Sequence, residues 1–185
     1  METTNITKMK EYLEQHKIMH SKNNVFVGNS LLKYSKYIKE IISDTKPERL
    51  LDYGCGKGLQ YTISLAHKDW GMENCPVLYD PCYEPFSYKP EGKFDMVICT
   101  DVLEHVPREE LGEVVRDIFR FTDGLAFFGV SVRPAKKNLP NGNNAHSTIK
   151  PISWWKAKID KHNINDVKYD LCYEDPDTPE IIKKF

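Results

Sequence analysis

The stretch Leu50-Leu51-Asp52-Tyr53-Gly54-Cys55-Gly56-Lys57-Gly58 decides the fold of this 185-residue chain. Two apolar residues and an acid precede three glycines, which are separated by one residue each. Glycine has no side chain and accepts a positive φ, so such a turn lets the backbone approach a ligand closely. The stretch joins an expected strand, 49–53, to an expected helix, 59–67, which is the usual setting of a loop that binds a nucleotide-type ligand.

Strands and helices alternate along the rest of the chain. Further strands are expected at 77–79, 94–100, 125–132 and 167–173, with a vestigial one near 86–87, and helices at 109–121 and 153–161. The continuous apolar run Val97-Ile98-Cys99 is typical of a parallel strand covered on both faces. The alternation predicts an α/β fold with a doubly wound, mostly parallel sheet of about six to seven strands, shortened around its third strand.

Helices are also expected before the first strand. A helix over 8–19 would carry four residues on one side, and Ser30 would cap a second helix over 31–43. We therefore divide the chain into an N-terminal helical lid, 1–46, and a ligand-binding domain, 47–185. The residues on one side of the first helix are Met9, Tyr12, Leu13 and His16.

Two more motifs stand where strands end, and ligands of such sheets bind at the carboxyl ends of the strands. Asp80 follows the second strand, and its two carboxylate oxygens could accept both hydroxyls of a ribose. Thr100 and Asp101 follow the 94–100 strand and lead into Val102-Leu103-Glu104-His105. With the glycine loop, these motifs resemble the class I S-adenosylmethionine (SAM) dependent methyltransferases over residues 50–132.

The resemblance implies that the chain binds SAM, releases S-adenosylhomocysteine (SAH) and has an antiparallel last strand. The cofactor-binding residues it implies are Asp52, Gly54, Cys55, Gly56, Gly58, Asp80, Pro81, Thr100, Asp101, Val102 and His105. Only thirteen residues separate Asp80 from Phe94, so the acid that contacts adenine in this family has no obvious counterpart.

A long polar loop, 133–148, follows the 125–132 strand on the expected ligand side. We expect Arg133, Asn144, His146 and Trp154 to bind the methyl acceptor, a small polar molecule such as a sugar or sugar nucleotide. His146 is the candidate general base because an imidazole titrates near neutral pH, and Asp101 is the second candidate catalytic residue. The alternative is that the lysines of this loop face water and the tryptophans pack as core. His20, Phe26 and Gly28 are expected beside the acceptor.

Composition limits the other possibilities. The 26 basic and 27 acidic residues give a net charge of −1, which does not favour nucleic acid as the partner. We find no apolar run of membrane-spanning length and no secretory signal pattern, and the five cysteines form no CxxC pair. We therefore expect a cytoplasmic monomer or homodimer without a metal. The alternatives are a nucleic-acid methyltransferase or a non-catalytic SAM-binding subunit.

Overall fold

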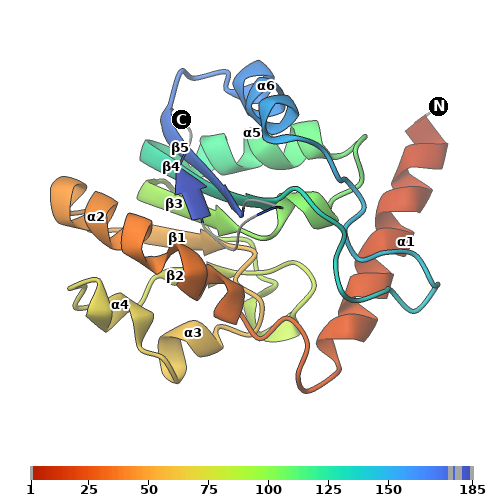
Figure 1. Cartoon of the computed structure of the whole chain (residues 1–185), viewed down its shortest axis with the longest axis horizontal. Helices are drawn as coiled ribbons and strands as arrows, with labels where there is room; N and C mark the ends of the chain where they lie inside the picture. The colour runs from red at the N-terminus through yellow and green to blue at the C-terminus, as the bar shows by residue number, and fades with distance from the viewer. Residues whose placement is uncertain (1, 175–176, 178–180, 184–185) are drawn as a thin grey trace.

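A six-stranded sheet forms the centre of the computed structural model, which describes residues 2–174, 177 and 181–183 (Figure 1). Strands β1 to β5 are parallel neighbours in the order β2-β1-β3-β4-β5, and β6 runs antiparallel to β5. The predicted doubly wound, mostly parallel α/β fold is therefore confirmed. The strands are β1 (Leu50–Tyr53), β2 (Val77–Tyr79), β3 (Phe94–Thr100), β4 (Thr122–Ser131), β5 (Lys168–Glu174) and β6 (Ile181–Lys183).

Helices cover both faces of the sheet (Figure 1). One face packs against α5 (Leu111–Phe121) and α6 (Ile152–His162). The other packs against the 3₁₀ helix η1 (Asn29–Tyr34) and the helices α2 (Ser35–Thr45), α3 (Leu59–Thr62) and α4 (Ala66–Asp69). Two short 3₁₀ helices, η2 (Glu84–Phe86) and η3 (Leu103–His105), follow β2 and β3.

The alternation of side chains along β3 links the two faces. Val97 and Cys99 lie in the cluster that contains α5 and α6, whereas Met96 and Ile98 lie in the cluster that contains α2. Successive side chains of a strand point to opposite faces, so a continuous apolar run is buried on both sides. This packing fixes the carboxyl end of β3, where the sequence predicts ligand-binding residues.

The expected helix over 59–67 is wrong as a single element. The chain forms α3 and α4 instead, separated by Leu65, which has a left-handed φ of +50°. The β-branched pair Thr62 and Ile63 lowers helix propensity just where α3 ends. The break lets both short helices bury residues, since Tyr61 of α3 and Ala66 of α4 both pack in the core beneath the sheet.

Three other expectations are corrected. Ser30 does not cap a helix: 29–34 form η1 behind Gly28, and α2 begins at Ser35. The vestigial third strand is replaced by η2, in which Pro85 lacks the N–H that a central strand needs. The expected strand over 167–173 is β5 and runs parallel to β4, so the antiparallel strand is β6.

The first helix, α1 (Glu2–His20), lies beside the 133–148 loop rather than on a face of the sheet (Figure 1). A small cluster joins them, and the Asn141 N–H donates to Gln15 Oε1 at 3.0 Å. The C-terminal end of α1 is thereby fastened to the loop. The buried members of this cluster are Met19, Val25, Leu139 and Ala145.

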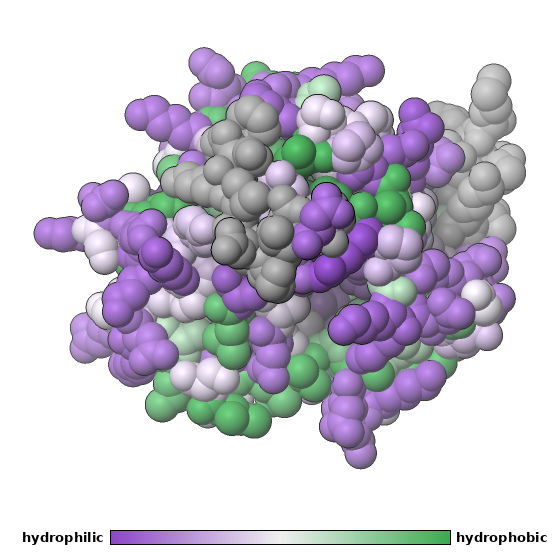
Figure 2. All heavy atoms as spheres, viewed as in Figure 1, coloured by the Kyte–Doolittle hydropathy of each residue, from purple (hydrophilic) through white to green (hydrophobic). Residues whose placement is uncertain are grey.

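The face seen in Figure 2 is mostly hydrophilic, with apolar residues gathered along the lower edge near α3 and α4. Ile63 and Leu65 are among the exposed large apolar residues. Within the described residues, none of the helices has the length and apolar character needed to cross a membrane.

Candidate functional site

A cavity of about 300 Å³ opens at the carboxyl ends of β1, β2 and β3. The glycine loop after β1, the turn after β2 and the segment after β3 line it, and α1 forms a further wall. This is the edge at which parallel α/β sheets bind their ligands. The lining includes these predicted cofactor residues: Gly54, Gly56, Asp80, Pro81, Thr100, Asp101, Val102 and His105.

Two of the loop glycines are required by geometry. Gly54 has a φ of +84°, and a Cβ there would lie 2.2 Å from Val102 Cγ2. Gly56 has a φ of +60°, and a Cβ there would lie 2.4 Å from the Phe26 carbonyl oxygen. A side chain at either position would be strained and would collide with its neighbour. The loop therefore brings bare backbone to the cavity.

Asp80 is 7 % exposed and is held by backbone donors. The Gly56 N–H donates to its Oδ2 at 2.9 Å, and the Cys82 N–H donates to its Oδ1 at 2.8 Å. Each carboxylate oxygen can accept more than one hydrogen bond, so both keep capacity for a ligand hydroxyl. His20 of α1 lies beside this carboxylate, with Nε2 at 3.7 Å from Oδ1.

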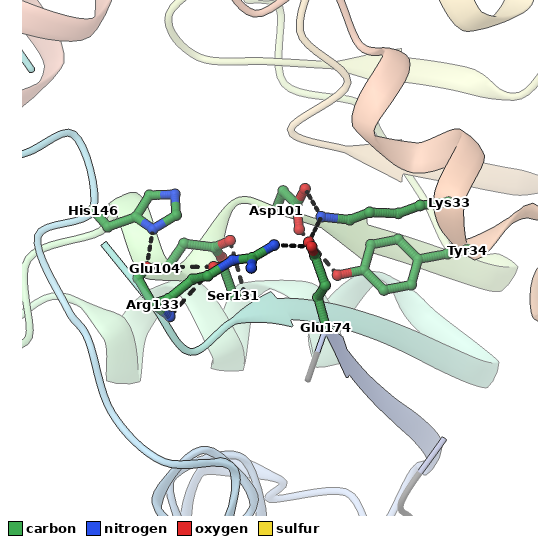
Figure 3. Close-up of polar contacts among 8 residues, drawn as sticks. All are labelled: Lys33, Tyr34, Asp101, Glu104, Ser131, Arg133, His146 and Glu174. Atoms are coloured by element: carbon green, nitrogen blue, oxygen red, sulfur yellow. Dashed lines mark hydrogen bonds and ion pairs between the residues drawn. The ribbon is translucent and has the colours of Figure 1, made fainter. Parts of the chain in front are cut away.

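Asp101 is fixed in an unusual backbone conformation at the end of β3, with a φ of +53°. Lys33 Nζ pairs with its Oδ2 at 2.6 Å, and the Tyr34 hydroxyl donates to its Oδ1 at 3.0 Å (Figure 3). Lys33 also pairs with Glu174 at the end of β5. A non-glycine residue at positive φ persists only where its surroundings hold it, and η1 supplies those contacts here.

Three imidazoles contact one another in a row, His16, His105 and His146. The ring of His105 makes edge contacts with His16 on one side and with His146 on the other, at centroid distances of 5.5 and 4.8 Å. The Nδ1 of each ring lies against a backbone carbonyl, which can only accept, so Nδ1 carries the proton. Each Nε2 therefore presents a lone pair.

Burial lowers the pKa of all three imidazoles, so they are neutral at pH 7. The pKa of His105 falls to about 3, and that of His16 to about 4. Glu104 is fully buried, and the Ser131 N–H donates to its Oε1 at 2.9 Å (Figure 3). Burial and the nearby charge of Asp101 raise the pKa of this carboxyl well above its usual value.

Three predicted cofactor residues are not among the described residues that line the cavity. These are Asp52, Cys55 and Gly58. Asp52 is buried, and its Oδ2 accepts hydrogen bonds from Gln60 Nε2 at 3.0 Å and the Tyr61 hydroxyl at 2.9 Å. It thus ties α3 to the end of β1. Asp52 shapes the glycine loop instead of facing the cavity.

The residues predicted to bind the acceptor are also absent from the described cavity lining. They are Arg133, Asn144, His146 and Trp154. Arg133 pairs with Glu174 (Figure 3). The Asn144 side chain hydrogen-bonds to the backbone of Ala135 within its own loop. Trp154 packs half-buried on the core side of α6. His146 is closest to the cavity and touches it through the ring of His105.

The sequence predicts an N-terminal helical lid with His20 beside the acceptor, but it does not indicate that four further residues of α1 line this cavity. It places the residues of one helix face together but gives them no ligand role, although His16 and His20 are spaced to share that face. The expected lining residues His20, Phe26 and Gly28 do line the cavity. The lining residues that α1 adds are Met9, Tyr12, Leu13 and His16.

Comparison with known proteins gives one match. A family model described as a methyltransferase domain matches residues 26–159. This span includes the glycine loop, Asp80, Asp101 and the row's His105 and His146, and it leaves α1 outside. Neither the curated proteins nor the solved structures contain a match to this chain.

Proposed function

Because this chain belongs to the methyltransferase-domain family, we propose that it transfers a methyl group from SAM to an oxygen or nitrogen of a small polar acceptor. One observation carries the cofactor assignment: the glycine loop, whose backbone leaves no room for side chains, and the backbone-held Asp80 carboxylate meet in a single cavity at the carboxyl ends of the strands. Bare backbone suits the amino-acid end of SAM, and a carboxylate with spare lone pairs suits the ribose.

SAM supplies an electrophilic methyl group on its sulfonium sulfur. The chain aligns the two reactants: Asp80 would hold the ribose, and Gly54 and Gly56 would approach the methionine end. Asp101, fixed by Lys33 and Tyr34, would accept a hydrogen bond from the ammonium group. Enclosure between α1 and the sheet excludes water and favours in-line attack on the methyl carbon.

We assign His146 as the base that takes a proton from a hydroxyl acceptor. Its Nε2 is unprotonated, because Nδ1 donates to the Arg133 carbonyl at 2.6 Å. His105 lines the cavity itself, but a pKa of about 3 makes it a weak base. His146→Ala should lower the turnover of a hydroxyl acceptor about 100-fold or more while leaving SAM affinity intact. Unchanged turnover would remove His146 from the mechanism.

More specifically, we propose that the acceptor is a sugar or sugar nucleotide. Support for this proposal came from Arg133, Asn144 and Trp154, which bond or pack elsewhere than in the cavity lining. A methyl-transfer screen should therefore span hydroxyl and amine compounds of several classes. A nucleic-acid acceptor would appear in such a screen as activity that falls steeply with salt.

Calorimetric titration with SAM, SAH and NADH tests the cofactor. We expect micromolar binding of the two adenosyl ligands and none of NADH. Asp80→Ala should weaken the adenosyl ligands about tenfold or more, because hydrogen bonds to a charged group are lost. Absence of adenosyl binding would contradict the proposal. Binding of SAM without methyl transfer to any acceptor would favour a non-catalytic subunit.

A further inference from the structure

His16 is a buried hydrogen-bond acceptor without a partner. It is 5 % exposed and lines the cavity from α1. Its Nδ1 donates to the Tyr12 carbonyl at 3.1 Å, and its Nε2 has no hydrogen-bond partner among the described residues. A buried polar atom left unpaired costs free energy, so Nε2 is suited to a ligand that brings a donor.

The place of His16 relative to Asp80 suggests which part of the ligand it meets. His20, beside the Asp80 carboxylate, lies four residues further along the same helix. Four residues of α-helix rise about 6 Å, which is comparable with the length of a purine ring system. A ribose held by Asp80 would therefore carry its base along α1 towards His16.

The walls of the cavity around His16 suit a flat, uncharged base. On the α1 side the lining includes Leu13 and Tyr12, and on the sheet side it includes Val102 and Val106. The turn after β2 forms η2 rather than a third strand, so α1 is the element available to close this side of the cavity. Apolar walls with a few polar groups are typical of sites for small heterocycles.

The donors of SAM narrow the assignment further. Its ammonium group has Asp101 and the glycine loop as partners, and its ribose hydroxyls have Asp80. The 6-amino group of adenine is the donor that remains. Two buried imidazole nitrogens of α1 lack a partner, His20 Nδ1 and His16 Nε2, and His16 is the one a helical turn away from the carboxylate that would hold the ribose. Resting on the proposed function, we propose that α1 forms a wall of the adenine subsite and that His16 Nε2 accepts a hydrogen bond from the adenine 6-amino group.

Two ligands separate this role from a general packing role: SAH and its analogue in which hydrogen replaces the 6-amino group. The native protein should bind SAH about three- to tenfold more tightly than the analogue, as expected for one buried hydrogen bond. His16→Phe keeps an aromatic ring but removes the acceptor, so it should bind both ligands equally. His16→Gln offers an amide oxygen and should keep part of the preference.

His162→Phe is the matched control, because His162 lies on α6 outside the described cavity lining and should leave both affinities unchanged. Calorimetry measures each affinity, and circular dichroism checks that each variant is folded. Equal binding of the two ligands by the native protein would overturn the role of His16 but not the proposed function. A preference for SAH retained in His16→Phe would do the same. Failure of the native protein to bind either ligand would instead overturn the proposed function.

Discussion

Asp52 illustrates how burial changes the chemistry of a single residue. It is 1 % exposed, and desolvation raises its pKa from 3.8 to about 7, although hydrogen bonds from Tyr61 and Gln60 oppose the rise. The sequence predicts that this carboxylate binds the cofactor. The neighbours that hydrogen-bond to it, Gln60 and Tyr61, come from α3, which ends at Thr62 instead of continuing as the longer helix expected from the sequence.

The raised pKa of Asp52 predicts a pH dependence of stability. Between pH 4 and 7 the folded protein binds the proton more tightly than the unfolded chain, so the free energy of unfolding falls as pH rises through this range. Asp52→Asn cannot ionise and can still accept from Tyr61, so its stability should fall less over the same range. Urea unfolding at a series of pH values measures this, and parallel curves for the two proteins would contradict it.

At the scale of elements, α1 is the part of the molecule that can be removed. The two large core clusters contain no described residue of α1, whereas they include Leu31, Tyr34 and Ile38 of η1 and α2. A cut near Thr45, at the edge of the lid predicted from sequence, would therefore remove core residues. A cut after Lys22 removes α1 alone.

Deletion of residues 1–22 should leave a folded protein that binds SAH about tenfold or more weakly, because a wall of the cavity is lost. Thermal unfolding followed by circular dichroism checks the fold, and calorimetry compares SAH affinity with that of the full chain. Unchanged affinity would show that α1 has no part in cofactor binding. The division of the chain into a helical lid, 1–46, and a ligand-binding domain, 47–185, remains a prediction.

Elements whose pattern is local were predicted well, and those decided by distant contacts were not. The apolar run of β3 and the helical spacing of α5 follow from the sequence because β3 is buried except at Asp95 and α5 buries one face. The 3₁₀ helix η1 and the parallel direction of β5 depend on neighbours far along the chain. The pairing of Arg133 with Glu174, 41 residues away, is a contact of the same kind, which the local sequence does not reveal.

At the scale of the whole molecule, the order of motifs along the chain was sufficient to predict the cavity. Parallel strands bring their carboxyl ends to one edge, so Gly54, Asp80 and Asp101 meet wherever the sheet forms. The wall added by α1 lies outside the 26–159 span of the family match. This chain therefore completes a shared site with a segment that the matched family model does not cover.

The small cluster that fastens α1 to the 133–148 loop also affects apparent affinity. Met19, Val25, Leu139 and Ala145 bury much less apolar surface than the sheet core, so undocking of α1 requires less free energy than global unfolding. A ligand held between α1 and the sheet binds the docked form more tightly than the undocked form. Its measured dissociation constant therefore rises as the docked fraction falls, so a substitution in this cluster would weaken cofactor binding without touching the cofactor.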